Sequence, residues 1–345
     1  MRLINSSFEI LEQSSGIEGI YKQIELAGRT CYKSLDKITE DSAKGFVDRM
    51  IKSQHYAMLE HGTVYLTIVQ FFNNYHREHF VDYYRSRGIT ESDIGNNSIN
   101  NYLWRYRDNK YSEIVNKSED GISIYYITTN LRVLVENGWL DDLKYLCEPT
   151  EYHAKRITVR FTTSNGIMRE FTRHRSHSFA VESTRYCNYS KEKFNNELVF
   201  VEPSWFNKDN MPFENWNHLL CKATPLLHCT DYDVLYEVPV SEYENGVLKR
   251  KWCKENWFIH SLQTAELAYL ESINDGAKPQ EAREVLPLAT KCDMVMTGFV
   301  SDWQHFFRLR TSIIAETGKP HPDASALADP LYKEFITRGY MEPLV

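Results

Sequence analysis

The segment 155-KRITVRFTTSNGIMREFTRHR-175 decides the fold, because its pattern changes sharply halfway along. Over 155–163 apolar and polar residues alternate, so that Ile157, Val159 and Phe161 share one face. A period of two is typical of a β-strand with one buried face. The polar and basic run that follows comes directly after this strand, with no linker between them. We therefore expect a strand that ends next to a functional segment, since residues just past a strand end are firmly held.

The basic run continues as 173-RHRSHSFAVESTRY-186. It brings together guanidinium, imidazole and hydroxyl groups, among them those of Arg173, His174, Arg175, Arg185, Ser178, Ser183 and Thr184. Guanidinium forks bind phosphate oxygens in a bidentate manner, so this composition suits a bound phosphate or pyrophosphate. A solvated basic loop is the alternative, and the preceding strand favours a binding site.

Helices and strands are expected on both sides of this segment. The range 63–69 (TVYLTIV) alternates like a strand. Helices are expected at 17–28, from Thr39 onward, at 127–137, at 256–274 with a stop at Gly276, from Pro279, over 301–316, and over a last segment up to Phe335. The helix over 301–316 is expected to bury five apolar residues, Trp303, Phe306, Phe307, Ile313 and Ile314. This mixture predicts an α/β (α+β) fold with a mainly antiparallel twisted sheet flanked by helices.

The chain shows no internal repeat and no linker that divides it clearly, so we predict a single domain over 1–345. Residues 70–122 are rich in Asn, Tyr, Arg and Ser and have weak periodicity. We interpret about 70–150 as an insertion that is partly irregular.

Bulk composition excludes several classes of protein. A formal charge of −7 argues against general binding to nucleic acid or to an anionic membrane. No apolar run is long enough for a transmembrane helix, and the N-terminus lacks a signal-peptide pattern, so we expect a cytoplasmic protein. Seven cysteines without a CxxC pair make a disulfide framework or a thiolate zinc site improbable.

The order of short motifs indicates a family. Arg173-His174-Arg175, followed by seven residues and Ser183, resembles the signature of the flavin-dependent thymidylate synthases. Four further blocks resemble segments of that family in the same order, namely AGRTCYKS (27–34), HYAMLEHGTVYLTI (55–68), AREVLP (282–287) and TGFVSDWQHFFRLR (297–310).

The resemblance implies reductive methylation of dUMP to dTMP, with methylenetetrahydrofolate as carbon donor and NADPH as the reductant of bound FAD. It implies that FAD is bound by Arg173, His174, Arg175, His55, Glu60 and His305. It implies that dUMP is bound by Glu170, Arg173, Ser183, Thr184, Arg185, Arg283 and Arg310. It also implies a homotetramer with active sites between subunits.

Arg310 is expected to act as the catalytic residue, against the uracil ring. Methylation at C5 builds negative charge on the ring and its carbonyl groups, and a fixed cation in a water-poor site stabilises that charge. A guanidinium stays protonated, so Arg310 would be an electrophile and not a general base. Trp303, Phe306 and Phe307 are expected to be core residues that aim this helix.

Several residues invite other interpretations. Cys187 suggests the cysteine nucleophile of classical thymidylate synthases, but the signature contains no such cysteine. Ser183 lacks a Gly-x-Ser-x-Gly elbow, so phosphate contact is the expected role. The pairs His76/His79 and His174/His177 have ligand-like spacing without a third ligand, so no metal is expected.

The chain departs from the family pattern at four positions. Ala180 and Val181 stand where Asn-Glu is common, Phe299 replaces an Asn that contacts flavin, and Ser301 replaces an Arg. These departures keep open a related enzyme that hydroxymethylates dUMP or acts on a modified deoxyuridylate. A nucleic-acid-binding module that uses 75–107 and 173–189 is the rival from another class, and it would bind with a steep salt dependence.

Overall fold

The computed structural model describes most of the chain, namely residues 1–71, 78, 81–83, 85–86, 90–91, 103–119, 121–210, 241–244, 247–251, 253–316 and 318–344. The chain forms two compact units, each of which is described by itself. The larger unit consists of residues 7–162, 168–182 and 292–345, and the smaller unit of residues 1–6, 163–167 and 183–291.

A four-stranded sheet with the order β2-β7-β12-β8 is the centre of the larger unit. Its strands are β2 (Ser7–Leu11), β7 (Arg156–Ser164), β12 (Lys291–Phe299) and β8 (Ser178–Val181). The pairs β2–β7 and β12–β8 are antiparallel. Ile157, Val159 and Phe161 of β7 are all buried, which confirms the strand predicted from their alternation.

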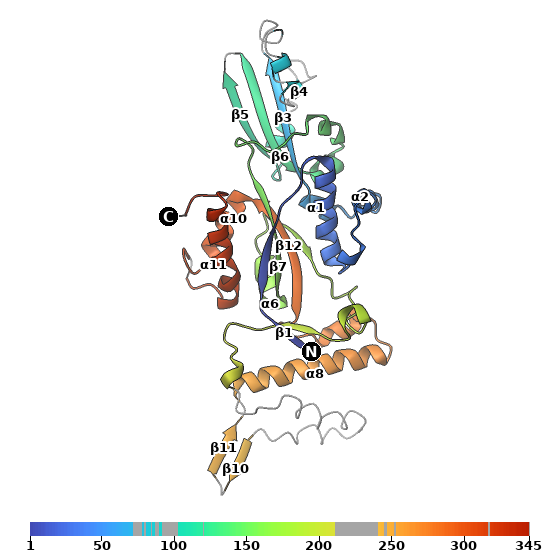
Figure 1. The fold of residues 1–345 in the computed structure, drawn as a ribbon, viewed down its shortest axis with the longest axis vertical. Coiled ribbons are helices and arrows are strands. Elements are labelled where there is room, and N and C mark those ends of the chain that lie inside the picture. Colours follow the sequence, from blue (N-terminus) through green and yellow to red (C-terminus); the bar gives the residue numbers. More distant parts are fainter. Residues whose placement is uncertain are drawn as a thin grey trace. The chain divides into compact units, whose positions relative to one another are not determined.

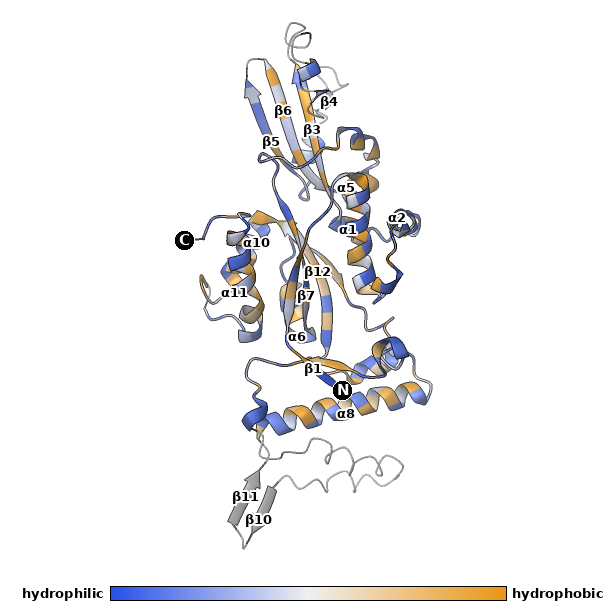
Figure 2. Cartoon of the chain, viewed as in Figure 1, coloured by the Kyte–Doolittle hydropathy of each residue, from blue (hydrophilic) through white to orange (hydrophobic). Residues whose placement is uncertain are grey.

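A second sheet in the larger unit has the order β4-β3-β6-β5. The strand β3 (Thr63–Phe71) pairs antiparallel with β6 (Ile122–Asn130) along its whole length, and β5 (Glu113–Glu119) pairs antiparallel with β6. The short β4 (Thr90–Glu91) is parallel to β3. Figure 2 shows β3 as mainly hydrophobic and β5 as mainly hydrophilic, as expected if β3 is internal and β5 lies at an edge.

Helices cover these sheets. The larger unit contains α1 (Gly16–Cys31), α2 (Ser42–Lys52), α5 (Leu131–Asn137), α10 (Val300–Arg310) and α11 (Pro322–Thr337), together with the 3₁₀ segments η1 (Leu35–Lys37), η2 (Tyr56–His61) and η3 (Leu140–Tyr145). Figure 1 labels the longer elements. Ile20 and Ile24 of α1 pack into one buried cluster with residues of β3 and β6. The predicted α/β class with mainly antiparallel sheets flanked by helices is confirmed.

The smaller unit is built around one long helix, α8 (Lys254–Asn274). Its strands are β1 (Arg2–Ile4) and β9 (Val199–Val201), which are parallel, and the antiparallel pair β10 (Ser241–Glu244) and β11 (Val247–Lys251). Its short helices are η4 (Glu192–Phe194), η5 (Lys208–Asn210), α9 (Pro279–Ala282) and η8 (Arg283–Val285). Leu262 and Tyr269 of α8 are fully buried in a cluster that also contains Leu198 and Phe200. The helix α6 (Asn165–Phe171) contributes residues to both units.

The helix predicted over 127–137 is wrong in its first part. Residues up to Asn130 belong to β6, and the helix begins at Leu131. The Asn130 side chain accepts a hydrogen bond from the backbone N–H of Val133, which is an N-cap contact. The β-branched and aromatic residues before it pair with β3 instead.

The helix predicted over 301–316 is too long. It ends at Arg310, where Thr311 adopts an extended backbone and bonds through its hydroxyl to the Phe307 carbonyl. Ile313 is 47% exposed and Ile314 is only partly buried, so the expected burial of both is wrong. The N-terminal boundary at Thr39 is displaced as well, since α2 begins at Ser42.

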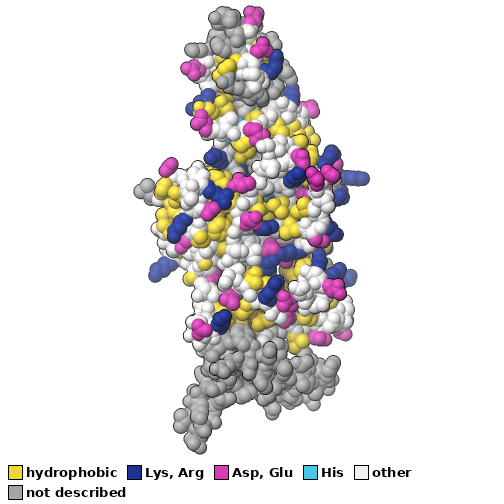
Figure 3. All heavy atoms as spheres, viewed as in Figure 1, with side chains coloured by type: hydrophobic (Ala, Val, Ile, Leu, Met, Phe, Trp, Pro, Cys, Tyr) yellow, Lys and Arg dark blue, Asp and Glu magenta, His cyan; other side chains and the backbone are white. Residues whose placement is uncertain are grey.

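The segment interpreted as an insertion contains regular structure where it is described. It holds β5, β6 and α5, and Leu103 and Tyr106 are part of the same buried cluster as β3. The interpretation as a partly irregular insertion stays a prediction, and these elements are the regular structure described within it. No helix among the described residues is both long enough and apolar enough to cross a membrane. Figure 3 shows acidic and basic side chains interspersed over the face in view.

Two glycines offer a matched test of helix packing. A Cβ on Gly28 of α1 would lie 2.4 Å from Cζ of the Phe46 ring of α2, whereas Gly45 of α2 is exposed and a Cβ there would make only an ordinary contact, 3.7 Å from Arg49 Nη1. We expect Gly28→Ala to lower the free energy of unfolding by about 1–3 kcal/mol, because the ring must move. Gly45→Ala should raise it by about 0.5–1 kcal/mol, because alanine favours a helix interior. Urea denaturation of both variants measures this, and equal effects would contradict the packing.

Candidate active site

An aromatic cluster fixes the helix that ends at Arg310. Trp303, Phe306 and Phe307 of α10 are fully buried, which confirms their predicted core role. The Trp303 Nε1–H donates to the Ile157 carbonyl of β7 at 3.1 Å. Phe306 lies edge-on to Phe171, with ring centroids 5.0 Å apart. Packing on both sides of the helix thus sets the direction in which its last residue projects.

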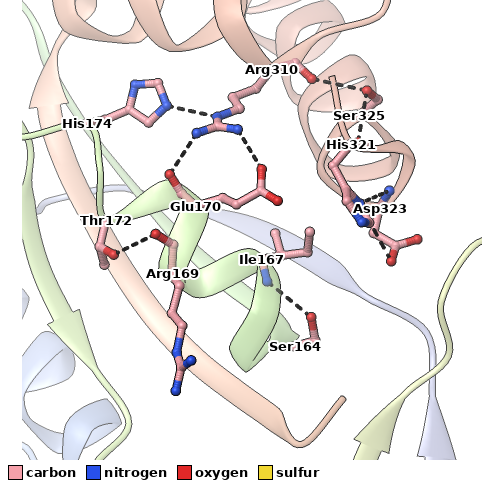
Figure 4. A network of polar contacts seen from close by, with 10 residues as sticks. All are labelled: Ser164, Ile167, Arg169, Glu170, Thr172, His174, Arg310, His321, Asp323 and Ser325. Atoms are coloured by element: carbon pink, nitrogen blue, oxygen red, sulfur yellow. Dashed lines mark hydrogen bonds and ion pairs between the residues drawn. The ribbon is translucent and has the colours of Figure 1, made fainter. Parts of the chain in front are cut away.

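The Arg310 guanidinium is held by three hydrogen bonds (Figure 4). Its Nε donates to His174 Nε2 at 3.0 Å, Nη1 donates to Glu170 Oε2 at 2.6 Å, and Nη2 donates to the Glu170 carbonyl at 2.9 Å. A guanidinium has five N–H donors, so one N–H on each Nη remains for a ligand. The side chain of Arg310 is only 16% exposed. Burial lowers its pKa from the usual value, and Glu170 opposes that shift.

His174 is a neutral acceptor in this arrangement. Burial, together with the positive charge of Arg310, lowers the pKa of His174 to about 4. Because Arg310 Nε–H donates to Nε2, the neutral ring carries its proton on Nδ1. His174 therefore orients Arg310 without adding a second positive charge.

The two arginines beside His174 differ from it. Arg173 and Arg175 are exposed, and neither side chain makes a hydrogen bond or ion pair with any described residue. The exposed His305 ring lies 6.0 Å from the His174 ring. The structure thus brings together Glu170, Arg173, His174, His305 and Arg310, all from the predicted site.

His55 and Glu60 lie at the two ends of η2, which packs against β8, the strand that follows the motif residues Arg173, His174 and Arg175. His55 is exposed and precedes η2 directly. Glu60 accepts a hydrogen bond from Arg132 of α5, which also pairs with Glu136 at 2.8 Å. Next to Glu60, the buried His61 Nδ1 lies 2.8 Å from the Thr297 hydroxyl of β12. Glu60 is therefore already paired with a cation, and no sequence pattern predicts this pair.

The remaining predicted residues lie in the smaller unit. Ser183 and Thr184 are partly buried, and Arg185 is exposed. The Arg185 Nε donates to Gln280 of α9 at 3.3 Å, and Arg283 is the residue that ends α9. Arg185 thus contacts α9, and Arg283 directly follows that helix in the chain.

The geometry bears on two alternative roles, a cysteine nucleophile at Cys187 and a metal site. Cys187 is only 1% exposed and belongs to the core of the smaller unit, which does not suit a nucleophile. The five described cysteines, Cys31, Cys147, Cys187, Cys253 and Cys292, form no disulfide. Among the described residues no group of three or more His, Cys, Asp and Glu could hold a metal, and His76 and His79 lie outside them.

Sequence reasoning missed a charged cluster beside the motif. Lys33 pairs with Asp293 of β12 and with Glu182, at 3.2 Å from Oε2. The same Glu182 oxygen accepts the Asp293 backbone N–H at 3.0 Å, and Thr162 donates to Asp293 at 2.7 Å. Glu182 immediately precedes Ser183, so this cluster fixes one end of the motif. No sequence signal indicates contacts between residues 33, 182 and 293.

Comparisons with known proteins agree with these features. The family described as Thymidylate synthase complementing protein (Thy1) matches residues 148–337, which is more than half of the chain. A "Probable flavin-dependent thymidylate synthase" of Paramecium bursaria Chlorella virus 1 is 27% identical over 180 residues, covering 52% of this chain and 67% of the viral protein. The "Flavin-dependent thymidylate synthase" of Pyrococcus furiosus is 26% identical over 141 residues, covering 41% of this chain and 40% of that protein.

Solved structures are more distant. The UMP/dUMP methylase PolB from Streptomyces cacaoi aligns with 98% of this chain and 93% of its own, at 13% identity and a TM-score of 0.38. Thymidylate Synthase X from Helicobacter pylori covers 52% of this chain and 66% of its own, at 17% identity and a TM-score of 0.29. The family match, and not these structures, defines the class of the chain, that of the thymidylate synthases. The chain belongs to the flavin-dependent thymidylate synthase (Thy1) family.

Buried neutral histidines should make the fold sensitive to acid. Burial lowers the pKa of His177 to about 3, and its ring lies 4.8 Å from that of Trp303. A pKa lowered by folding gives stability that is present above the unfolded value of about 6.5 and is lost as pH falls. Between pH 7 and pH 5 this amounts to about 2 kcal/mol for one such group.

Between pH 7 and pH 5 the free energy of unfolding should fall less in His177→Phe than in the unchanged protein. The expected difference is up to about 2 kcal/mol. Urea denaturation at pH 7 and pH 5 measures the difference. His321→Asn is the control, because His321 is exposed and asparagine preserves its N-cap contact with Asp323. Identical pH dependence in all three proteins would contradict a buried neutral His177.

Proposed function

We propose that this protein catalyses the reductive methylation of dUMP to dTMP, with methylenetetrahydrofolate as carbon donor and FAD reduced by NADPH. The observation that carries the proposal is the Arg310 guanidinium, held by Glu170 and by a neutral His174. This fixed, half-desolvated cation suits a reaction in which negative charge develops on a uracil ring. Membership of the flavin-dependent thymidylate synthase family supports the same activity.

The residues next to Arg310 fit a flavin dinucleotide. A pyrophosphate needs cations that are not already neutralised, and the side chains of Arg173 and Arg175 have no partner among the described residues. We propose that these two arginines and His174 bind FAD, together with His55, Glu60 and His305. Bound FAD would supply the hydride that completes the methyl group.

In the proposed reaction Arg310 binds the uracil through its two remaining N–H groups. Glu170 keeps the guanidinium in place and balances part of its charge, so the cation does not have to reorganise as charge develops on the ring. Glu170, Arg173, Ser183, Thr184, Arg185 and Arg283 are proposed as the other dUMP contacts. A guanidinium holds its proton, so Arg310 stabilises charge and does not move a proton.

A homotetramer is proposed as the assembly, and light scattering on the purified chain tests it. Hydroxymethylation of the same nucleotide remains the second candidate, because Phe299 stands where the family has Asn. The mass of the product distinguishes a methyl from a hydroxymethyl group. The nucleic-acid-binding rival requires salt-sensitive binding and no flavin absorbance.

Flavin binding can be tested on one arginine with a matched control. Arg175→Ala should release most of the FAD while the protein stays folded, because an exposed side chain contributes little to stability. Arg169→Ala is the control, since Arg169 is also exposed and its side chain points away from Arg310 (Figure 4). The ratio of flavin absorbance to protein measures the result. Full FAD retention by Arg175→Ala would remove this residue from the flavin site.

The role of Arg310 can be tested by turnover. Arg310→Ala should lower the turnover number by about 10²–10³-fold, the usual effect of removing one donor to a developing anion. Arg310→Lys should restore only part of it, because an ammonium has three donors and cannot reproduce the planar fork that bonds His174 and Glu170 and still offers two N–H groups. Flavin reduction by NADPH should persist in both variants, since that step does not involve uracil.

Cys187→Ser serves as the control for this experiment and should stay within a few-fold of the unchanged protein. The measurement is formation of dTMP under saturating substrates. If Cys187→Ser abolishes dTMP formation and Arg310→Ala does not, stabilisation of the uracil by Arg310 is ruled out.

A further inference from the structure

A cavity of about 230 Å³ lies within the larger unit, apart from the Arg310 network. It is lined by the end of β2, the start of α1, the start of β3, the segment 146–149 and the start of β7. Its apolar wall is formed by Ile10, Leu11, Ile20, Leu146 and Ile157. The cavity therefore has an aliphatic wall, and all of its lining residues belong to the larger unit.

Arg156 is a cation in this wall that forms no ion pair with a described residue, and Glu60 and Asp302 act on it only from beyond ion-pair distance. Its Nη1 donates to the Glu60 carbonyl at 3.1 Å and to the Thr63 hydroxyl at 3.3 Å, and neither acceptor is charged. Its Nε is buried and has no hydrogen-bond partner among the described residues. No described carboxylate lies within ion-pair distance of this guanidinium. Three of its five N–H groups are therefore available to an acceptor.

A partly buried cation without an ion pair among the described residues is costly to the folded state. Burial lowers the pKa of Arg156 to about 10, which reflects the loss of hydration around the charge. A buried charge is ordinarily paired, because desolvation is not otherwise offset. An anion in the cavity would provide the missing pair and the missing acceptors.

The other charges of the cavity do not supply that pair. Glu12 bonds Arg338 at 2.9 Å and the Tyr340 hydroxyl, and Glu148 accepts from the Ser15 hydroxyl at 2.7 Å. Lys155 is exposed and lies over the Tyr340 ring, 5.9 Å from its centroid. The start of α1 also faces this cavity through Ser15 and Gly16, and a helix N-terminus favours negative charge.

The cavity is suited to binding and not to chemistry. Cys147 lines it, with its sulfur 3.8 Å from His153 Nε2. His153 Nδ1 accepts the Thr150 backbone N–H at 3.1 Å, so the proton of the neutral ring is on Nε2 and points toward the Leu66 carbonyl. His153 thus cannot take a proton from Cys147. Burial also raises the pKa of the Cys147 thiol, which keeps it protonated.

We propose that this cavity binds a small organic carboxylate, with the carboxylate on Arg156 and an apolar body against the aliphatic wall. Its volume lies above the roughly 150 Å³ that hold benzene in an engineered cavity and below the roughly 300–1,000 Å³ of pockets for drug-sized ligands. A ligand with one ring or one branched chain fits that range. The lining of the cavity does not include Arg310, Arg173 or Arg175, whereas Arg156 bonds the carbonyl of Glu60, which is one of the proposed flavin residues.

Benzoate is a suitable probe, with benzyl alcohol as its neutral analogue and inorganic phosphate as an anion without an apolar body. We expect saturable benzoate binding to the full chain in NMR or calorimetric titrations. Arg156→Met should weaken it by about tenfold or more, as expected for loss of a charge-assisted contact. Binding of benzyl alcohol should change little between the two proteins.

Lys52→Gln is the matched control, because it removes one exposed positive charge from α2 and should leave benzoate binding unchanged. Ile10→Trp provides an independent variant that fills the cavity and keeps Arg156, and it should abolish benzoate binding. It also keeps the proposal testable if Arg156→Met does not fold. FAD content, measured by absorbance, should be the same in all three variants.

Three results would overturn the proposal. Benzoate binding that is equal in the unchanged protein, Arg156→Met and Ile10→Trp would show that the cavity is not the site. If phosphate binds in a manner that depends on Arg156 and benzoate does not bind, the ligand of the cavity is a free phosphate and not an organic carboxylate. Loss of FAD in Arg156→Met, with competition between benzoate and FAD, would make Arg156 part of the flavin site.

Discussion

The pairing of Arg310 with Glu170 and His174 is the interaction on which the proposed chemistry depends. A guanidinium that is only 16% exposed must be compensated, and here one carboxylate oxygen, one carbonyl and one imidazole nitrogen do so. Because only Glu170 is charged, the group retains part of its field for a substrate. Two carboxylates would cancel that field, and a protonated His174 would repel the cation.

Burial provides both the position and the protonation state of these groups. The aromatic rings of α10 and α6 exclude water from one side of His174, whose ring lies 5.0 Å from that of Phe306. The same desolvation lowers the pKa of His174 and keeps the ring neutral. The strand β12 approaches the His177 ring closely at Gly298, where a Cβ would lie 2.4 Å from His177 Cδ2. Packing of apolar rings thus sets the electrostatics of the polar residues beside them.

Local patterns predicted much of this fold. The alternation in β7 and β3 and the aromatic spacing in α10 follow from which residues are buried, and burial has a period along a strand or helix. The same reasoning failed at 127–130, where apolar residues fit a helix and a strand equally well and pairing with β3 decides. It failed at 311–316, because the Thr311 hydroxyl and the Ser312–Asp329 contact end the helix through side chains distant in sequence.

The candidate site likewise contains residues that local sequence predicted and contacts that it could not predict. The motif identified Arg173, His174 and Arg175 because their types are adjacent in sequence, and the family resemblance added Glu170 and Arg310. The partners of Glu60 and Glu182 could not be predicted, since Arg132 and Lys33 are 72 and 149 positions away in the chain and follow no period. Tertiary contacts of this kind depend on the complete fold.

The contact between Phe299 and Arg156 gives a physical reason for the departure from the family pattern at position 299. The Arg156 guanidinium lies 5.5 Å from the centroid of the Phe299 ring, so an aromatic residue at this position faces a cation that a smaller amide would leave less covered. Phe299 also begins α10, where its backbone N–H donates to Asp302 at 3.0 Å. The ring therefore covers one face of the guanidinium without neutralising it, and Asp302 remains committed to the helix end. This explains how Arg156 can be partly desolvated and still form no ion pair with a described residue, although Glu60 and Asp302 act on it from farther away.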